Sequence, residues 1–131
     1  MTTRLTAEVA LAYVRELSTD FRAGIVLNGA LEPIAGDREL AAAARALFEA
    51  HPDARELQAG AVFAARGEDR AIVVVTGEFA LQRVTRGDLR TALFGAGVSN
   101  AQEGSLERPQ AALVKALVTA SADAFRRHRA V

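Results

Sequence analysis

The chain has 131 residues, half of them hydrophobic, and its 16 basic and 16 acidic side chains give a formal net charge of zero. This length fits a single domain, 1–131, with its own core. The charge balance argues against a nucleic-acid-binding protein, which is normally strongly basic, and against a role at anionic membrane surfaces. The absence of cysteine excludes disulfides, zinc–cysteine sites and thiol catalysis.

The N-terminal stretch carries Glu8, Arg15 and Glu16 and lacks the apolar region of a secretory signal peptide. No stretch of the sequence approaches the roughly 20 apolar residues that a membrane-spanning helix needs. The expected compartment is the cytoplasm.

The first predicted elements are a helix and a β-hairpin. Apolar residues at helical spacing predict a helix over 6–19, with Thr6 as its N-cap. The β-branched run at 25–27 predicts a buried strand, and Asn28-Gly29 predicts a tight two-residue turn. Pro33 cannot donate to a sheet ladder, so the second strand, 30–35, should be short and at an edge.

A second helix is predicted to start at Asp37, which can cap it, and to end before Pro52. Alanine at 41–44 and 46 gives this helix high propensity and a slim surface. Such a surface suits close packing either against a copy of itself or against the protein's own sheet, and both alternatives are open.

The second half of the chain predicts another hairpin and two helices. Segments 56–66 and 70–77 flank a polar turn, and Ile72–Val75 should form a central strand because both of its faces are apolar. A helix over 78–94 follows, and Gly87 weakens it by about 1 kcal/mol relative to alanine. The glycine-rich stretch 95–105 predicts a linker, and Ser105 should open a last helix over 106–127, with Glu107 and Pro109 in its first turn.

The expected fold class is therefore α+β. Strands grouped in hairpins predict a central antiparallel sheet of four to five strands, flanked by helices and followed by an extra C-terminal helix. The terminal helix has three open arrangements: packing on its own domain, capping a dimer, or exchanging between two copies.

No catalytic, metal-binding or cofactor-binding constellation is evident in the sequence. His51 and His128 have no partner at metal-ligand spacing, and both are expected at the surface. The basic tail 126–129 is expected to be a solvated helix end, and the serines lack the context of a nucleophile elbow. The expectation is a protein that is not an enzyme, with no catalytic residues, no metal and no cofactor.

The order of elements over 6–94 resembles the roadblock/longin-like group, specifically the bacterial roadblock-type domains. The stretches that carry the resemblance are AGIVLNGALEPIAG, DRELAAAARALFEA, AVFAARGEDRAIVVVTG and LQRVTRGDLRTAL. The chain departs from the family pattern in two places. Only two strands are plain after the second helix, so a third would have to lie within 54–60, and Asn28 stands where the family's turn often has an acidic residue.

The resemblance implies a non-catalytic scaffold that forms a homodimer through the second helix and an adjacent edge strand. It also implies a regulator or adaptor of a small Ras-like GTPase. The interaction surface expected on the second helix comprises Arg38, Ala41, Ala42, Arg45 and Glu49.

Two other functions remain open from the sequence. An antiparallel sheet covered by helices can enclose a pocket, so the domain could be a small-molecule sensor with Arg22, Asn28 and Thr76 as pocket groups. The other alternative is an enzyme with an unrecognised site.

Overall fold

The computed structural model describes residues 6–18, 20–77, 85–87, 89, 91–92 and 106–129. In chain order its elements are α1 (Ala7–Leu17), β1 (Phe21–Asn28), β2 (Pro33–Gly36), the 3-10 turn η1 (Arg38–Leu40), α2 (Ala41–Ala50), β3 (Glu56–Ala59), β4 (Val62–Arg66), β5 (Arg70–Thr76), β6 (Leu106–Glu107) and α4 (Ala111–Arg129). Residues 85–87, 89, 91 and 92 are also helical.

The strands form one sheet in the order β2-β1-β5-β4-β3-β6. The first five strands pair antiparallel with their neighbours, and β6 pairs parallel with β3. The expected α+β fold with an antiparallel sheet is confirmed. The strand sought within 54–60 is β3, and β5, which holds Ile72–Val75, lies between β1 and β4 as expected of a central strand.

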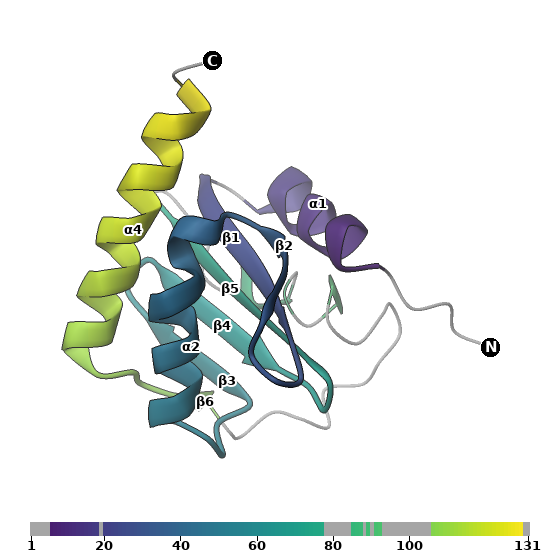
Figure 1. Ribbon diagram of the computed structural model, residues 1–131, viewed down its shortest axis with the longest axis vertical. Helices are drawn as coiled ribbons and strands as arrows, with labels where there is room; N and C mark the ends of the chain where they lie inside the picture. Colours follow the sequence, from purple (N-terminus) through teal and green to yellow (C-terminus); the bar gives the residue numbers. More distant parts are fainter. Residues whose placement is uncertain are drawn as a thin grey trace.

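Helices cover both faces of the sheet (Figure 1). Because side chains alternate along a strand, β5 directs Val73 and Val75 into the core beneath α2 and α4, and Ile72 and Val74 into the core beneath α1. All four side chains are almost completely buried. Burying an aliphatic side chain of this size contributes about 1.5–3 kcal/mol. These four residues of β5 therefore stabilise both cores.

The first hairpin has a wider turn than the two residues that Asn28-Gly29 predicted. β1 ends at Asn28 and β2 begins at Pro33, which leaves four residues in the loop. The Asn28 side-chain oxygen accepts hydrogen bonds from the backbone N–H groups of Ala30 (2.9 Å) and Glu32 (3.0 Å). The asparagine therefore stabilises a wider loop instead of forming a tight turn, while the short edge strand expected from Pro33 is confirmed.

The C-terminal helix begins later than the sequence predicted. Leu106 and Glu107 form β6, which pairs with Glu56 and Leu57 of β3, and α4 begins only at Ala111. The prediction of a helix from Ser105 was wrong because the free edge of β3 offers an extended segment a hydrogen-bonding partner. Pro109 also disfavours helical geometry in the residue before it.

α4 packs on its own domain, the first of the three arrangements left open by the sequence. It lies beside α2 on the same face of the sheet, as Figure 1 shows, and it contacts η1 and β1. Leu117 and Ala124 of α4 are completely buried in the core beneath it. The predicted linker 95–105 and most of the predicted helix 78–94 lie outside the described residues.

Candidate functional site

The surface expected from the sequence on the second helix is largely present. Four of the five residues are exposed, and their spacing of four, three and four places them on one face of η1 and α2. This face is called the α2 outer stripe, and it comprises Arg38, Ala42, Arg45 and Glu49. The fifth residue, Ala41, is half-buried and packs against the core, so it does not belong to this exposed stripe.

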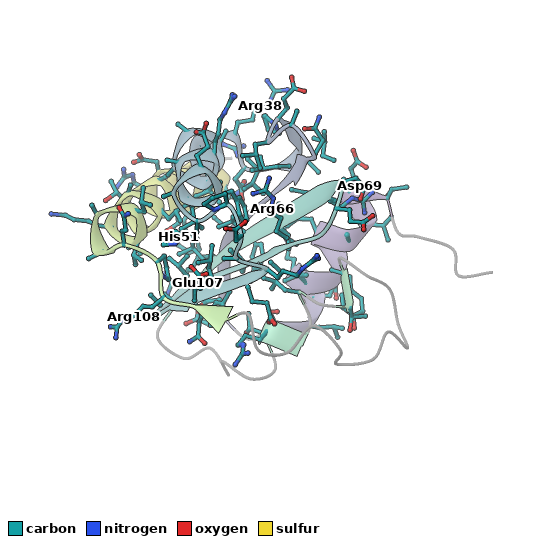
Figure 2. The ribbon with its side chains drawn as sticks, turned by 90° about the horizontal axis from the view of Figure 1, so that it is seen from below. Arg38, His51, Arg66, Asp69, Glu107 and Arg108 are labelled. Carbon is teal, nitrogen blue, oxygen red and sulfur yellow. The ribbon has the colours of Figure 1, made fainter. Side chains whose placement is uncertain are left out.

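The opposite face of α2 is part of the hydrophobic core. Ala44 and Leu47 are completely buried, Phe48 is almost so, and the half-buried Ala43 packs against them. Most of the alanines therefore fit the helix against its own sheet, and Ala42 is the alanine on the outer stripe. Arg38 lies on the side of α2 that faces away from the sheet (Figure 2).

Among the described residues, the charges of the outer stripe form one weak ion pair. Arg45 Nε lies 3.8 Å from Glu49 Oε1 one helical turn later, and both side chains are more than half exposed. An exposed pair at this spacing stabilises a helix by about 0.3–0.5 kcal/mol. Arg45 and Glu49 can therefore exchange this contact for a partner at little cost.

The carboxylate of Asp37, which the sequence predicted to cap the second helix, is buried and connects three elements of the fold instead. Asp37 is 2% exposed and makes no side-chain capping bond to the helix. One of its oxygens accepts a hydrogen bond from the Gly24 N–H (3.1 Å), and the other lies 3.0 Å from Arg127 Nη2 and 2.7 Å from His128 Nε2. The capping prediction was wrong because charged groups from α4 form stronger bonds to this carboxylate.

Glu39, two residues further along within η1, reinforces this contact. Its carboxylate accepts hydrogen bonds from Nε and Nη2 of Arg127. These bonds lower the pKa of Glu39 below its ordinary value of 4.5 and raise the pKa of Arg127 above its ordinary range. We call Asp37, Glu39, Arg127 and His128 the Asp37 cluster, and it fastens the end of α4 to the start of η1.

Both histidines have partners that the sequence did not indicate. The His51 side chain is only 13% exposed, and its Nδ1 lies 3.3 Å from Glu107 Oε2 (Figure 2). The expectation of a surface position for His51 was therefore wrong. His128 is 45% exposed but bonded to Asp37, so the tail 126–129 is more than a solvated helix end.

A surface hollow lies between α4 and the ends of β1 and β5. It has a volume of about 330 Å³ and a mostly apolar lining. We call it the α4 hollow; Arg22, Thr76 and Gly77 line it from the strands, and Val118, Phe125 and Arg126 line it from α4.

Two of the three pocket groups expected from the sequence lie at the α4 hollow. These are Arg22 and Thr76, whereas Asn28 is bonded within the first hairpin. The Thr76 hydroxyl lies 3.3 Å from the Ala61 carbonyl oxygen and 3.1 Å from that of Gly77. Its single proton is thus already used, and Arg22 is the polar group on the strand side with donors to spare.

Glu56 is a second buried carboxylate that the sequence did not single out. It is 6% exposed, and its Oε1 lies 3.8 Å from Arg86 Nε, which is too long for a hydrogen bond. Within the described ranges, no group of three or more His, Asp or Glu side chains is arranged to hold a metal ion. The same part of the chain contains no helix with the length and apolar character needed to cross a membrane.

Comparisons with protein-family models, with curated proteins and with solved structures found no match to this chain. No relative therefore indicates a role for the α2 outer stripe, the Asp37 cluster or the α4 hollow. Their function has to be inferred from their own geometry and charge.

Proposed function

We propose that this domain is a non-catalytic protein-interaction module that forms a homodimer and acts as a regulator or adaptor of a small Ras-like GTPase. The observation that carries the proposal is the α2 outer stripe, which exposes two arginines, one alanine and one glutamate on a single helix face. The resemblance of residues 6–94 to bacterial roadblock-type domains supports the same role. Those domains typically pair through the second helix and act beside such GTPases.

The α2 outer stripe is complementary to a second copy of itself. When two such helices pack antiparallel across a twofold axis, Arg38 faces Glu49 of the partner subunit and Ala42 faces Arg45 of the partner subunit. Both pairs are centred on the same point of the helix, between residues 43 and 44. Two Arg–Glu pairs then form by symmetry, and the small side chain of Ala42 lets the helices approach closely.

The edge strand beside α2 is less available for pairing than the resemblance implies. β6 already pairs with Glu56 and Leu57, two of the four residues of β3. The proposed contact therefore rests mainly on the ten residues of α2. We expect so short a helix to bury less surface than a standard stable interface, which buries about 1,200–2,000 Å². We expect a dimer that dissociates on dilution.

Sedimentation over a concentration series tests the homodimer. The protomer mass is 13.9 kDa, and the apparent mass should rise toward twice this value with concentration. Arg38→Glu should weaken the dimer, and adding Glu49→Arg should restore it because the charges are exchanged. Lys115→Glu, an exposed change on α4, is the control. A monomer at every concentration, or a double variant as weak as the single one, would overturn the proposed dimer.

Affinity capture from the host's lysate, with bound proteins identified by mass spectrometry, tests the GTPase. The tagged wild-type protein should retain a small GTPase, the Arg38→Glu/Arg45→Glu variant should lose it, and Lys115→Glu should keep it. Capture that survives the charge reversals would place the contact elsewhere. A capture that contains no small GTPase would contradict the proposed adaptor role.

A second candidate function is a small-molecule-binding module. The α4 hollow favours it, because its volume lies at the lower end of the range for ligand pockets, about 300–1,000 Å³. An apolar lining with one or two charged groups is also the usual composition of such pockets.

A further inference from the structure

We propose that the α4 hollow binds a small amphipathic anion, with its carboxylate between Arg22 and Arg126 and its apolar part against Val118 and Phe125. This inference rests on the second of the two proposed functions and names the ligand class. It is independent of the α2 outer stripe, since no residue of the stripe lines the hollow.

The helix side of the hollow is a continuous wall. Val118, Ser121, Ala122 and Phe125 follow one another at spacings of three, one and three, which places them on one face of α4. Val118 is a large apolar side chain, yet it is 44% exposed. The Ser121 hydroxyl donates to the Val118 carbonyl oxygen at 2.7 Å, so it presents no free donor, and the wall offers a ligand mainly apolar surface.

The strand side of the hollow has irregular backbone at two neighbouring points. The register between β1 and β5 shifts between Phe21 and Ala23, so Arg22 sits at a bulge. Asp20 has a φ of 60°, which is rare for a residue with a side chain. Bulges redirect side chains, and strained backbone collects where a protein positions functional groups.

Gly77 completes this corner of the hollow. A Cβ atom at this position would lie 2.0 Å from Asp20 Oδ2, so no larger residue fits there without displacing Asp20. The Gly77 N–H also donates to the Asp20 carbonyl oxygen at 2.8 Å. Asp20, Arg22 and Gly77 therefore form one interlocked unit, which holds Arg22 at the edge of the hollow.

The charges of the lining select an anion. Among the described residues, the lining of the hollow includes the guanidinium groups of Arg22 and Arg126, and the carboxylates paired with them, those of Asp20 and Asp123, are not part of this lining. Arg22 Nε is 3.4 Å from Asp20 Oδ1, and its guanidinium lies 5.0 Å from the centre of the Phe125 ring. Arg126 bonds to Asp123 on the same helix, and its side chain is 73% exposed.

Each guanidinium carries five N–H donors, so these contacts leave donors for a ligand carboxylate. A carboxylate can accept two parallel bonds from one guanidinium, a geometry that neither an alcohol nor an amine reproduces. The stacking of Arg22 on Phe125 places the charged group directly beside apolar surface. Such an arrangement suits a ligand that is charged at one end and apolar along the rest.

The volume of the hollow sets the size of the ligand. At about 30 Å³ for each group the size of a water molecule, the hollow holds about ten such groups. Octanoate has a carboxylate and a short apolar chain of this size. Octan-1-ol and octylammonium have the same number of carbon atoms and differ in the head group, so the three compounds form a matched set.

The test is a titration of the full-length, isotope-labelled protein with these three compounds, followed by amide ¹H–¹⁵N spectra. Octanoate should shift the amide signals of Gly77, Ser121 and Phe125, and it should bind at least several-fold more tightly than octan-1-ol or octylammonium. Shifts spread over the whole protein, or confined to another surface, would overturn the assigned site.

Variants separate the roles of charge and shape. Arg22→Gln and Arg126→Gln should each lower the affinity for octanoate about two- to fivefold, as expected for partly exposed charged contacts. Lys115→Gln, on the same helix but outside the lining, should leave binding unchanged. Ala122→Phe adds bulk at an exposed position of the wall and should abolish binding while the spectrum stays that of a folded protein.

The outcomes distinguish the ligand class from the function on which it rests. If octan-1-ol binds at the hollow as tightly as octanoate, the anion selectivity is wrong while small-molecule binding stands. If none of the three compounds shifts the lining residues, both are overturned. Neither result affects the homodimer or the GTPase contact, which are measured on different variants.

Discussion

Nε2 of His128 lies 2.7 Å from Oδ1 of Asp37, although 91 residues separate the two in the sequence. A carboxylate can only accept, so Nε2 of the imidazole carries the proton of this bond. Arg127 bonds to the same oxygen, and the Gly24 N–H bonds to the other. One buried carboxylate thus connects β1, η1 and the end of α4.

Replacing Asp37 should therefore loosen three elements at once. We expect Asp37→Ala to lower the free energy of unfolding by about 1–3 kcal/mol, because it leaves the Gly24 N–H and two α4 side chains without their acceptor. Urea unfolding measures this change, with Asp53→Ala at an exposed position as the control. Equal effects of the two substitutions would contradict the role assigned to Asp37.

The contact between Glu39 and Arg127 should make stability depend on pH. Because Arg127 lowers the pKa of Glu39 in the folded state, the contribution is present above the ordinary value of 4.5 and is lost as pH falls through the lower folded-state pKa. Urea unfolding from pH 7 to pH 3 should show wild type losing its advantage over Glu39→Gln at the acidic end. Arg127→Gln should remove the same dependence, and an advantage over Glu39→Gln that is constant with pH would argue against the pair.

Two neighbouring residues of α4 test its packing on the sheet. Leu117 is completely buried and Val118 is 44% exposed. Leu117→Ala should cost about 2–5 kcal/mol of unfolding free energy, because it leaves a cavity in the core. Val118→Ala should stay within about 0.5 kcal/mol, as expected for a surface change. If both substitutions proved mild, α4 would not be packed as the structure places it.

Two glycines with positive φ should respond differently to the same substitution. Gly60 has a φ of 54° and open space around it. Gly60→Ala should therefore lower the free energy of unfolding by only about 1–2 kcal/mol, the cost of holding a residue with a Cβ in the left-handed conformation. At Gly36, with a φ of 102°, a Cβ would lie 2.4 Å from the Gly24 carbonyl oxygen. Gly36→Ala should therefore cost about 1–3 kcal/mol more, since the β1–β2 pairing must shift. Thermal unfolding of both variants measures the difference, and equal costs would refute the steric argument.

Features that depend on neighbouring residues could be predicted well from the sequence. Thr6 caps α1 by accepting a hydrogen bond from the Val9 N–H, and α2 ends before Pro52. The run Ile72–Val75 forms the central strand because its apolar residues suit burial on both faces. Each of these outcomes depends on side-chain period, capping chemistry or proline geometry within a few residues.

Predictions failed where a distant segment offered the stronger interaction. Residues 106 and 107 became a strand because the edge of β3 was available, and the Asp37 carboxylate bonds to α4 instead of capping η1. His51 was expected at the surface, but β6 brings Glu107 to it. No local pattern records any of these partners, since each lies more than 45 residues away.

The sequence alone therefore determined the α+β class, the central strand and the exposed stripe of α2, because periodicity and capping act over one or two turns of chain. Only the tertiary structure decided how α4 packs, which charges surround Asp37, and that Arg22 and Arg126 meet at one hollow. Those features arise where segments about 100 residues apart come together. Their energies depend on burial and distance in three dimensions, which the order of residues does not display.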